Sequence, residues 1–173
     1  MRDRSAKQPS KKSSRPARAK RGQAVALKKT GGGAVSFCLR RPRGKSSRAD
    51  FTPSQLIAVV QTGLPIQELK DLQASLKVPM EQLVPMLGIS KATLHRRKAG
   101  GRLGVAESDR VVRFARLMGQ AVEVMESTAG ARQWLTSPQF GLGGAVPLAY
   151  AGTEIGAREV EDLLGRIEHG VYS

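Results

Sequence analysis

The chain has 173 residues and a single cysteine, Cys38, which excludes an intramolecular disulfide and a multi-cysteine zinc site. No run of eighteen apolar residues occurs, so we predict no membrane span. The net charge is +15 at pH 7, and residues 1–50 contribute most of it with 16 basic and 2 acidic side chains. A basicity so concentrated in one segment favours an anionic partner such as nucleic acid.

Residues 1–50 are rich in Lys, Arg, Ser, Gly and Pro, and we predict a disordered basic arm. Within it, residues Ala34 to Arg40 are expected to form a short strand when they contact another surface. The arm has two open interpretations. It could add sequence-independent DNA affinity, or it could be a dispensable extension produced by a start codon placed too far upstream.

Folded structure is expected to begin at Phe51. Thr52 and Pro53 form the typical start of a helix, an N-cap followed by a proline at the first helical position, and this helix should end at Gly63. A second amphipathic helix should start at Pro65, because apolar residues recur every three to four positions, at Ile66, Leu69, Leu72 and Leu76.

The next segment has the pattern of a helix-turn-helix. Residues 80–87 should form a short helix, and Gly88 is suited to the left-handed residue that ends it. Ser90 should cap a second helix over residues 91–98, with Leu94 facing its partner helix. A second helix with a basic outer face favours the DNA major groove, although an ordinary hairpin with a solvated charged face is the alternative.

We assign candidate DNA contacts on this hairpin in two groups. The predicted groove-facing residues are Ser90, Lys91, Ala92, His95 and Arg96. The predicted phosphate contacts are Arg97 and Arg102.

A long helix from about Ala106 to Met125 should follow, with arginines at positions 110, 113 and 116 on one stripe. Such a stripe is usually a solvated face, and a phosphate contact is the second interpretation. This helix is also a candidate dimer surface. Further on, a short helix over residues 131–135 is expected to bury Trp134 as a core anchor.

The segment after Leu117 is net negative. The glycine-rich loop over residues 139–147 resembles phosphate-binding loops only weakly, because it lacks the Lys-Ser/Thr of a P-loop. A last helix should be capped near Thr153, with charged residues on one face. Its apolar face should pack into the core, through Leu163, Leu164 and Ile167 among others.

Four motifs resemble the Xre/MbcA/ParS family of type II antitoxins, which accompany RES-domain toxins. They are Leu94-His95-Arg96-Arg97, Glu107-Ser108-Asp109-Arg110, Trp134-Leu135, and the ending EVEDLLGRIEHGVYS from Glu159 to Ser173. The resemblance covers roughly residues 64–173. The long ending is its most specific part.

The resemblance implies an all-α homodimer with an Xre-like helix-turn-helix domain at 51–125 and a toxin-binding domain at 126–173, after the disordered arm at 1–50. It implies that the protein covers the active site of an NAD-consuming RES-domain toxin and represses its own operon on operator DNA. A cytoplasmic location, nucleoid-associated on DNA, follows, with no cofactor, no metal and no membrane. The residues expected to bind toxin are Glu161, Asp162, Arg166, Glu168, His169, Tyr172 and Ser173.

Two other functions remain open. One is a stand-alone transcriptional regulator with no toxin partner. The other is an enzyme, which the sequence disfavours because no nucleophile–base pair, metal-ligand spacing or complete phosphate loop is present.

Overall fold

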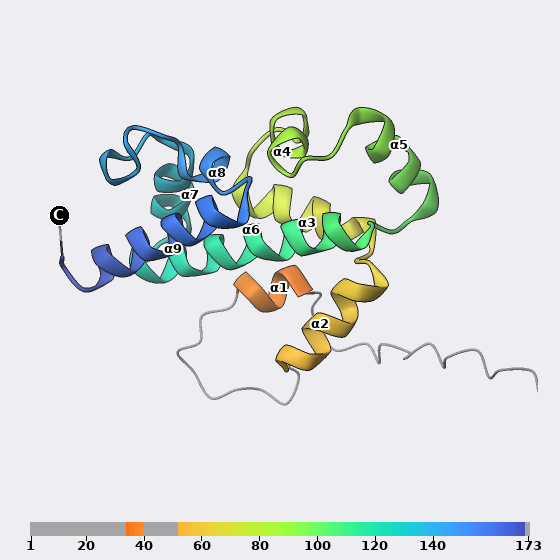
Figure 1. Cartoon of the computed structure of the whole chain (residues 1–173), viewed down its shortest axis with the longest axis horizontal. Helices are drawn as coiled ribbons and strands as arrows, with labels where there is room; N and C mark the ends of the chain where they lie inside the picture. The colour runs from red at the N-terminus through yellow and green to blue at the C-terminus, as the bar shows by residue number, and fades with distance from the viewer. Residues whose placement is uncertain (1–33, 40–51, 172–173) are drawn as a thin grey trace, which may run out of the picture.

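The computed structural model describes residues 34–39 and 52–171 (Figure 1). Every regular element among these residues is helical, as the sequence predicts. In this part of the chain no helix has both the length and the apolar character needed to cross a bilayer. The elements are α1 (Ala34–Leu39), α2 (Pro53–Thr62), α3 (Ile66–Leu76), α4 (Met80–Met86), α5 (Lys91–Gly100), α6 (Val105–Val124), α7 (Thr128–Thr136), the 3-10 turn η1 (Phe140–Leu142), α8 (Pro147–Tyr150) and α9 (Glu154–Glu168).

The long helix α6 is the axis of the molecule, and α1, α2, α3, α7 and α9 all pack against it (Figure 1). Phe114 and Leu117 are completely buried on it, and half of its twenty residues are buried. Its apolar residues occupy more than one stripe, because the helix contacts neighbours on several sides. Most of α6 is covered by other helices of the same chain, which leaves little of it exposed as the predicted dimer surface.

The helix-turn-helix forms as predicted, from α4 and α5. Gly88 has a left-handed φ of 62° after the last turn of α4, where a residue with a Cβ would be strained. The Ser90 hydroxyl accepts a hydrogen bond of 3.1 Å from the amide of Thr93 and so caps α5. The second helix continues to Gly100, two residues beyond the predicted end.

The strand prediction for residues 34–40 is wrong, because Ala34–Leu39 forms helix α1. Ala34 and Val35 are buried, and the helix packs against α3 and α6. Their backbone amides donate hydrogen bonds of 3.0 and 2.9 Å to the buried carboxylate of Glu68. Folded structure therefore begins before Phe51, because a carboxylate from a distant helix satisfies the amides that this segment cannot cap itself. The rest of the predicted disordered arm lies outside the described residues.

The carboxyl-terminal helices cover the other side of α6. Thr153 caps α9 through its hydroxyl, as predicted, and α9 then lies along α6. Leu163 and Leu164 are buried and Ile167 is half-buried against the core, which confirms the predicted packing. Trp134 is only half-buried, so it lines the edge of the core rather than anchoring its centre.

Candidate functional site

The outer face of α5 is the first candidate site. Its five predicted groove-facing residues are all exposed: Ser90, Lys91, Ala92, His95 and Arg96. Leu94 is half-buried against the core and fixes which side of the helix faces outward. Lys91 and His95 are four residues apart, as are Ala92 and Arg96, so these four side chains share one broad face of the helix, and Ser90 precedes it as the N-cap. A helix presented in this way can enter a major groove.

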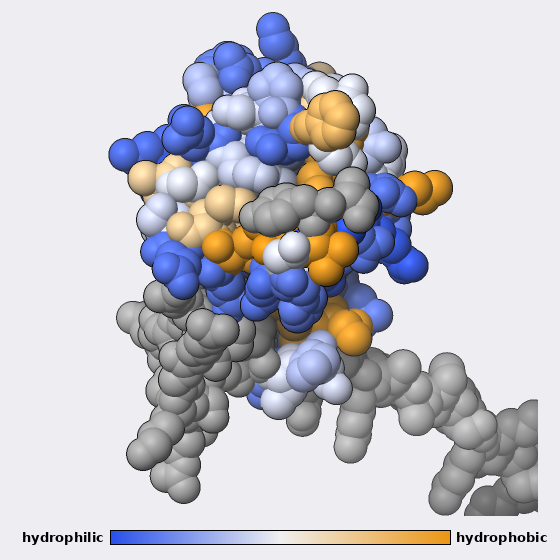
Figure 2. Space-filling model, turned by 90° about the vertical axis from the view of Figure 1, so that its left-hand side faces the viewer, coloured by the Kyte–Doolittle hydropathy of each residue, from blue (hydrophilic) through white to orange (hydrophobic). Residues whose placement is uncertain are grey.

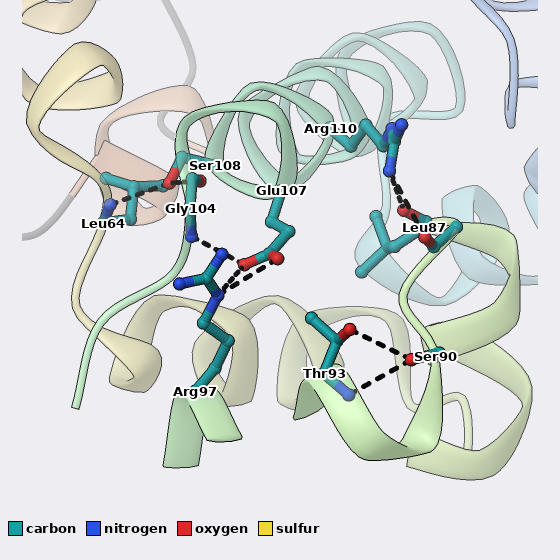
Figure 3. Close-up of polar contacts among 10 residues, drawn as sticks. Leu64, Leu87, Ser90, Thr93, Arg97, Gly104, Glu107, Ser108 and Arg110 are labelled. Atoms are coloured by element: carbon teal, nitrogen blue, oxygen red, sulfur yellow. Dashed lines mark hydrogen bonds and ion pairs between the residues drawn. The ribbon is translucent and has the colours of Figure 1, made fainter. Parts of the chain in front are cut away.

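Arg97 behaves differently from its neighbours (Figure 3). Its Nε donates hydrogen bonds of 3.1 and 2.8 Å to the two carboxylate oxygens of Glu107 at the start of α6. The same carboxylate accepts 2.6 Å from the amide of Gly104, which forms one half of a capping box, because a glycine N-cap has no side chain to return the bond. The sequence interval between Arg97 and Glu107 gave no sign of this pairing.

These contacts set the charge of Glu107. Burial by itself raises the pKa of this carboxyl, but hydrogen bonds from Arg97 and Gly104 and the charges of Arg97 and Arg96 act the other way. Their combined effect holds the pKa of Glu107 below its usual value. An ionised Glu107 therefore locks the end of α5 to the beginning of α6.

Arg102, the second predicted phosphate contact, donates to the carbonyl oxygens of Gly63 and Thr62. Nearby, the Ser108 hydroxyl accepts 2.8 Å from the Leu64 amide and donates 2.7 Å to the Gly104 carbonyl (Figure 3). Both arginines predicted to contact phosphate thus have partners within the chain, whereas Arg96 is exposed and forms no ion pair among the described residues.

Each of the three arginines in the stripe on α6 has a partner within the chain. Arg110 donates 2.9 Å to the Leu87 carbonyl at the turn of the helix-turn-helix (Figure 3). Arg113 forms ion pairs of 2.9 Å with Asp109 and 2.8 Å with Glu154. Each arginine therefore joins α6 to another part of the fold or to its own preceding turn.

The third arginine, Arg116, pairs with Glu161 on α9. The hydrogen bond that Arg116 donates to Glu161 raises the pKa of Arg116. Glu161 is consequently engaged inside the chain, although the sequence placed it on a partner surface.

The second candidate site is the end of the molecule where α9 finishes, opposite α5 along the long axis (Figures 1 and 2). Asp162, Glu168 and His169 are exposed there. Arg166 is half-buried, and its Nε is fully buried with no hydrogen-bond partner in the described part of the chain. Apolar side chains lie among the charged ones on this end (Figure 2). Tyr172 and Ser173 lie outside the described residues.

Sequence reasoning missed one prominent residue of this half, Phe140. It lies in the η1 turn between α7 and α8 and is 98% exposed. The signal that could have drawn attention to it is composition. From Gln133 to Thr153 the chain has no charged residue, and a lone phenylalanine precedes a glycine-rich turn.

Two protein families match this sequence. Residues 55–116 match the "Antitoxin Xre-like helix-turn-helix domain", and residues 120–170 match the "Antitoxin Xre/MbcA/ParS C-terminal toxin-binding domain". The chain is 35% identical over 120 residues to the Antitoxin Xre of Yersinia enterocolitica and, equally, to that of Photorhabdus laumondii, covering 68% of this chain and 81% of each relative. It is also 28% identical over 132 residues to the "Prs ADP-ribosylating antitoxin" of a Sphingobium species, covering 70% and 83% of the two chains.

Proposed function

Because this chain belongs to the Xre antitoxin family, whose members are regulatory rather than enzymatic, we propose that it neutralises an NAD-consuming RES-domain toxin and represses its own operon. One observation carries the proposal. Helix α5 and the end of α9 lie at opposite ends of the long helix α6 (Figure 1), and exposed basic residues lie on the first while exposed Asp162 and Glu168 lie on the second. A protein with two such ends can hold operator DNA and a toxin at the same time. It would act in the cytoplasm, on the nucleoid when bound to DNA.

Operator binding is assigned to α5. Lys91 and Arg96 are exposed on its outer face, beside the short polar side chain of Ser90. Arg96 is the side chain best suited to reading a base edge, because its guanidinium forms no ion pair among the described residues. Arg97 and Arg102 support this helix from behind, so we now assign them a positioning role rather than a direct phosphate contact.

Toxin neutralisation is assigned to the end of α9. Residues 126–173 contain six acidic and three basic side chains, in contrast to the basic hairpin. An enzyme that consumes NAD binds an anionic nucleotide, and basic side chains on that surface would complement Asp162 and Glu168. Covering the entrance to such a site would stop the reaction without any chemistry by the antitoxin.

A homodimer is the assembly that we propose, with α2 as its contact surface. This helix has no buried residue, and Ile57 is 57% exposed. Residues 51–67 contain no charged side chain, in a protein whose net charge is +15. No like charges face each other where two copies of α2 meet, and the exposed apolar side chain of Ile57 would be buried there, so this helix is the best place for two copies to associate. A dimer would also supply two copies of α5 for two operator half-sites.

The test is co-expression with the product of the adjacent gene, following growth and the cellular NAD level. Deleting residues 154–173 is a poor test, because Val160 and Leu164 on α9 cover the buried side of α6. Charge reversal of two exposed residues, Asp162→Lys with Glu168→Lys, leaves the core intact and should abolish rescue. Arg96→Ala should retain rescue and lose promoter repression.

Rescue by the charge-reversed protein at wild-type strength would contradict the assigned surface. If the adjacent gene product is not toxic, the antitoxin function fails, and the protein is a stand-alone regulator that acts through α5.

A further inference from the structure

The turn that carries Phe140 is fixed in place by its neighbours. The Gln139 side chain donates 2.9 Å to the Trp134 carbonyl and 3.1 Å to the Ser137 carbonyl. Its backbone amide donates 3.0 Å to the Ala145 carbonyl, which closes the loop across its base. Gly144 adopts a φ of 83° and donates 2.9 Å to the Gln139 carbonyl. The loop therefore has a defined shape in the absence of any partner.

The turn is also seated on α9. Leu142 points inward and is 9% exposed. A Cβ added to Gly141 would lie 2.6 Å from Cδ1 of Leu163, so a larger residue here would require the Leu163 side chain to shift. Leu142 and Gly141 are both packed against the core. Phe140, which lies between Gln139 and Gly141, therefore projects outward from a well-anchored turn.

Phe140 is then 98% exposed, the highest exposed fraction of any large apolar residue in the described part of the chain. An aromatic side chain on a preorganised loop loses little conformational entropy when it binds, since only two torsions must be fixed. Central aromatic anchors of this kind carry a large share of the affinity in protein interfaces. No residue among those that the structure describes buries the ring.

We propose that Phe140 is the anchor by which this protein recognises its toxin, inserting into an uncharged apolar hollow on the toxin surface. This inference rests on the proposed antitoxin function. The ring belongs to a segment, Gln133 to Thr153, that carries no charged residue, so we expect its complement to be apolar rather than basic. The loop lies within the matched toxin-binding domain and far from α5, which argues for a toxin rather than DNA (Figure 1).

Phe140 and the charged end of α9 would have different roles in binding the toxin. The charged residues there would steer the encounter and set its orientation, whereas the ring would slow dissociation once it is buried. Two chemically different contacts on one domain also give specificity, because a toxin must offer both a basic rim and an apolar hollow.

The experiment measures the affinity of the purified full-length protein for the co-expressed product of the adjacent gene. Phe140→Ala should weaken binding about tenfold or more, mainly through faster dissociation, and Phe140→Trp should restore most of it. Val105→Ala removes a 52% exposed apolar side chain from the DNA-binding half and is the matched control. Thermal unfolding should not change for any of these variants, because neither site contributes to the core.

The possible outcomes distinguish failure of the Phe140 anchor from failure of the proposed antitoxin function. If the wild-type protein binds and Phe140→Ala binds within about twofold of it, the anchor is refuted and the antitoxin function stands. If the wild-type protein does not bind the toxin, the proposed function itself fails. If Phe140→Ala changes the oligomeric state instead of toxin affinity, the ring meets a second copy of this chain, which also refutes the inference.

Discussion

At the scale of single residues, Glu107 has the largest structural role of any acidic side chain on α6. It accepts hydrogen bonds from Arg97 and from the Gly104 amide, and its own side chain is only 12% exposed. Removing a buried acceptor leaves its donors without partners, which costs more than the bond itself is worth. The fixed connection between the end of α5 and the start of α6 depends on this carboxylate.

We expect Glu107→Gln to lower the free energy of unfolding by about 1–3 kcal/mol at neutral pH. The pKa of Glu107 is lowered in the folded protein, so its stabilising effect is present above about pH 4.3, the ordinary pKa of a glutamate. The effect should disappear as the pH falls through the lower, folded-state pKa. Urea titrations of both proteins at several pH values test this, and a difference that grows in acid would contradict it.

Arg96 and Arg97 are adjacent in the chain and should respond in opposite ways to truncation. Arg96→Ala should leave stability within about 0.5 kcal/mol of the wild type, because the side chain is exposed. It should weaken binding to the DNA upstream of the gene by about 1–3 kcal/mol and relax its sequence preference. A uniform loss across sequences, with a shallower salt dependence, would instead identify Arg96 as a phosphate contact.

Arg97→Ala should destabilise the fold, because it leaves Glu107 with the Gly104 amide alone. The double variant with Glu107→Gln should be less destabilised than the sum of the two single variants, by about 0.5–3 kcal/mol. Additive effects in chemical denaturation would show that the pair contributes no coupling energy.

At the scale of elements, the features that the sequence predicts correctly are those determined within four residues. The caps at Thr52, Ser90 and Thr153 and the turn at Gly88 are examples, since each depends on one side chain and the amides of the next turn. The helical period likewise predicts which face of a helix is buried. These signals were enough to predict the all-helical fold and the orientation of α5.

The elements that were missed depend on partners distant in the sequence. Helix α1 is held by the Glu68 carboxylate, which accepts hydrogen bonds from the amides of Ala34 and Val35. These amides lie 34 and 33 residues away in the sequence. The partner of Arg97 lies beyond a turn, and the exposure of Phe140 follows from the packing of Leu142 and Gly141 on α9. Composition shows that such residues are present but not which groups they meet.

The docking of α1 can be measured through Cys38. Burial raises the pKa of this thiol to about 11, although the nearby Arg116 acts to lower it and Glu68 to raise it. Because the reactive thiolate is scarce at neutral pH, Cys38 should react slowly with a thiol reagent such as DTNB. Glu68→Gln removes one of the two acceptor oxygens and should speed the reaction by about tenfold through more frequent opening of α1.

Glu81→Gln is the matched control for that experiment, since Glu81 is an exposed acid on α4. It should leave the rate unchanged. A rate in the wild-type protein equal to that in urea would show that α1 is not docked in solution.

At the scale of the whole molecule, α2 is the helix that is least covered by the rest of the fold, because none of its residues is buried. A ten-residue helix is marginal in water unless it packs against something, and α2 packs only along one edge (Figure 1). We therefore expect the wild-type protein to sediment with the mass of two 18.6 kDa chains.

Ile57→Glu should shift the protein to the monomer, because it would place two like charges against each other across the contact. The same charge at exposed Gln82 on α4 should leave the dimer intact. Sedimentation equilibrium distinguishes the two. A dimer that survives Ile57→Glu would exclude α2 as the contact surface.

The continuity of α6 has a consequence for how proteins of this design diversify. No linker separates the DNA-binding half from the toxin-binding half. The two matched family regions end at residue 116 and begin at residue 120, both inside α6, and Arg132 on α7 also donates 2.6 Å to the Ser75 carbonyl on α3. A chimera joined between the halves would therefore inherit a mismatched core. On the proposed assignments, new pairings between toxin and operator would arise by substitutions at the exposed ends, around Arg96 and around Phe140, while the shared interior is kept.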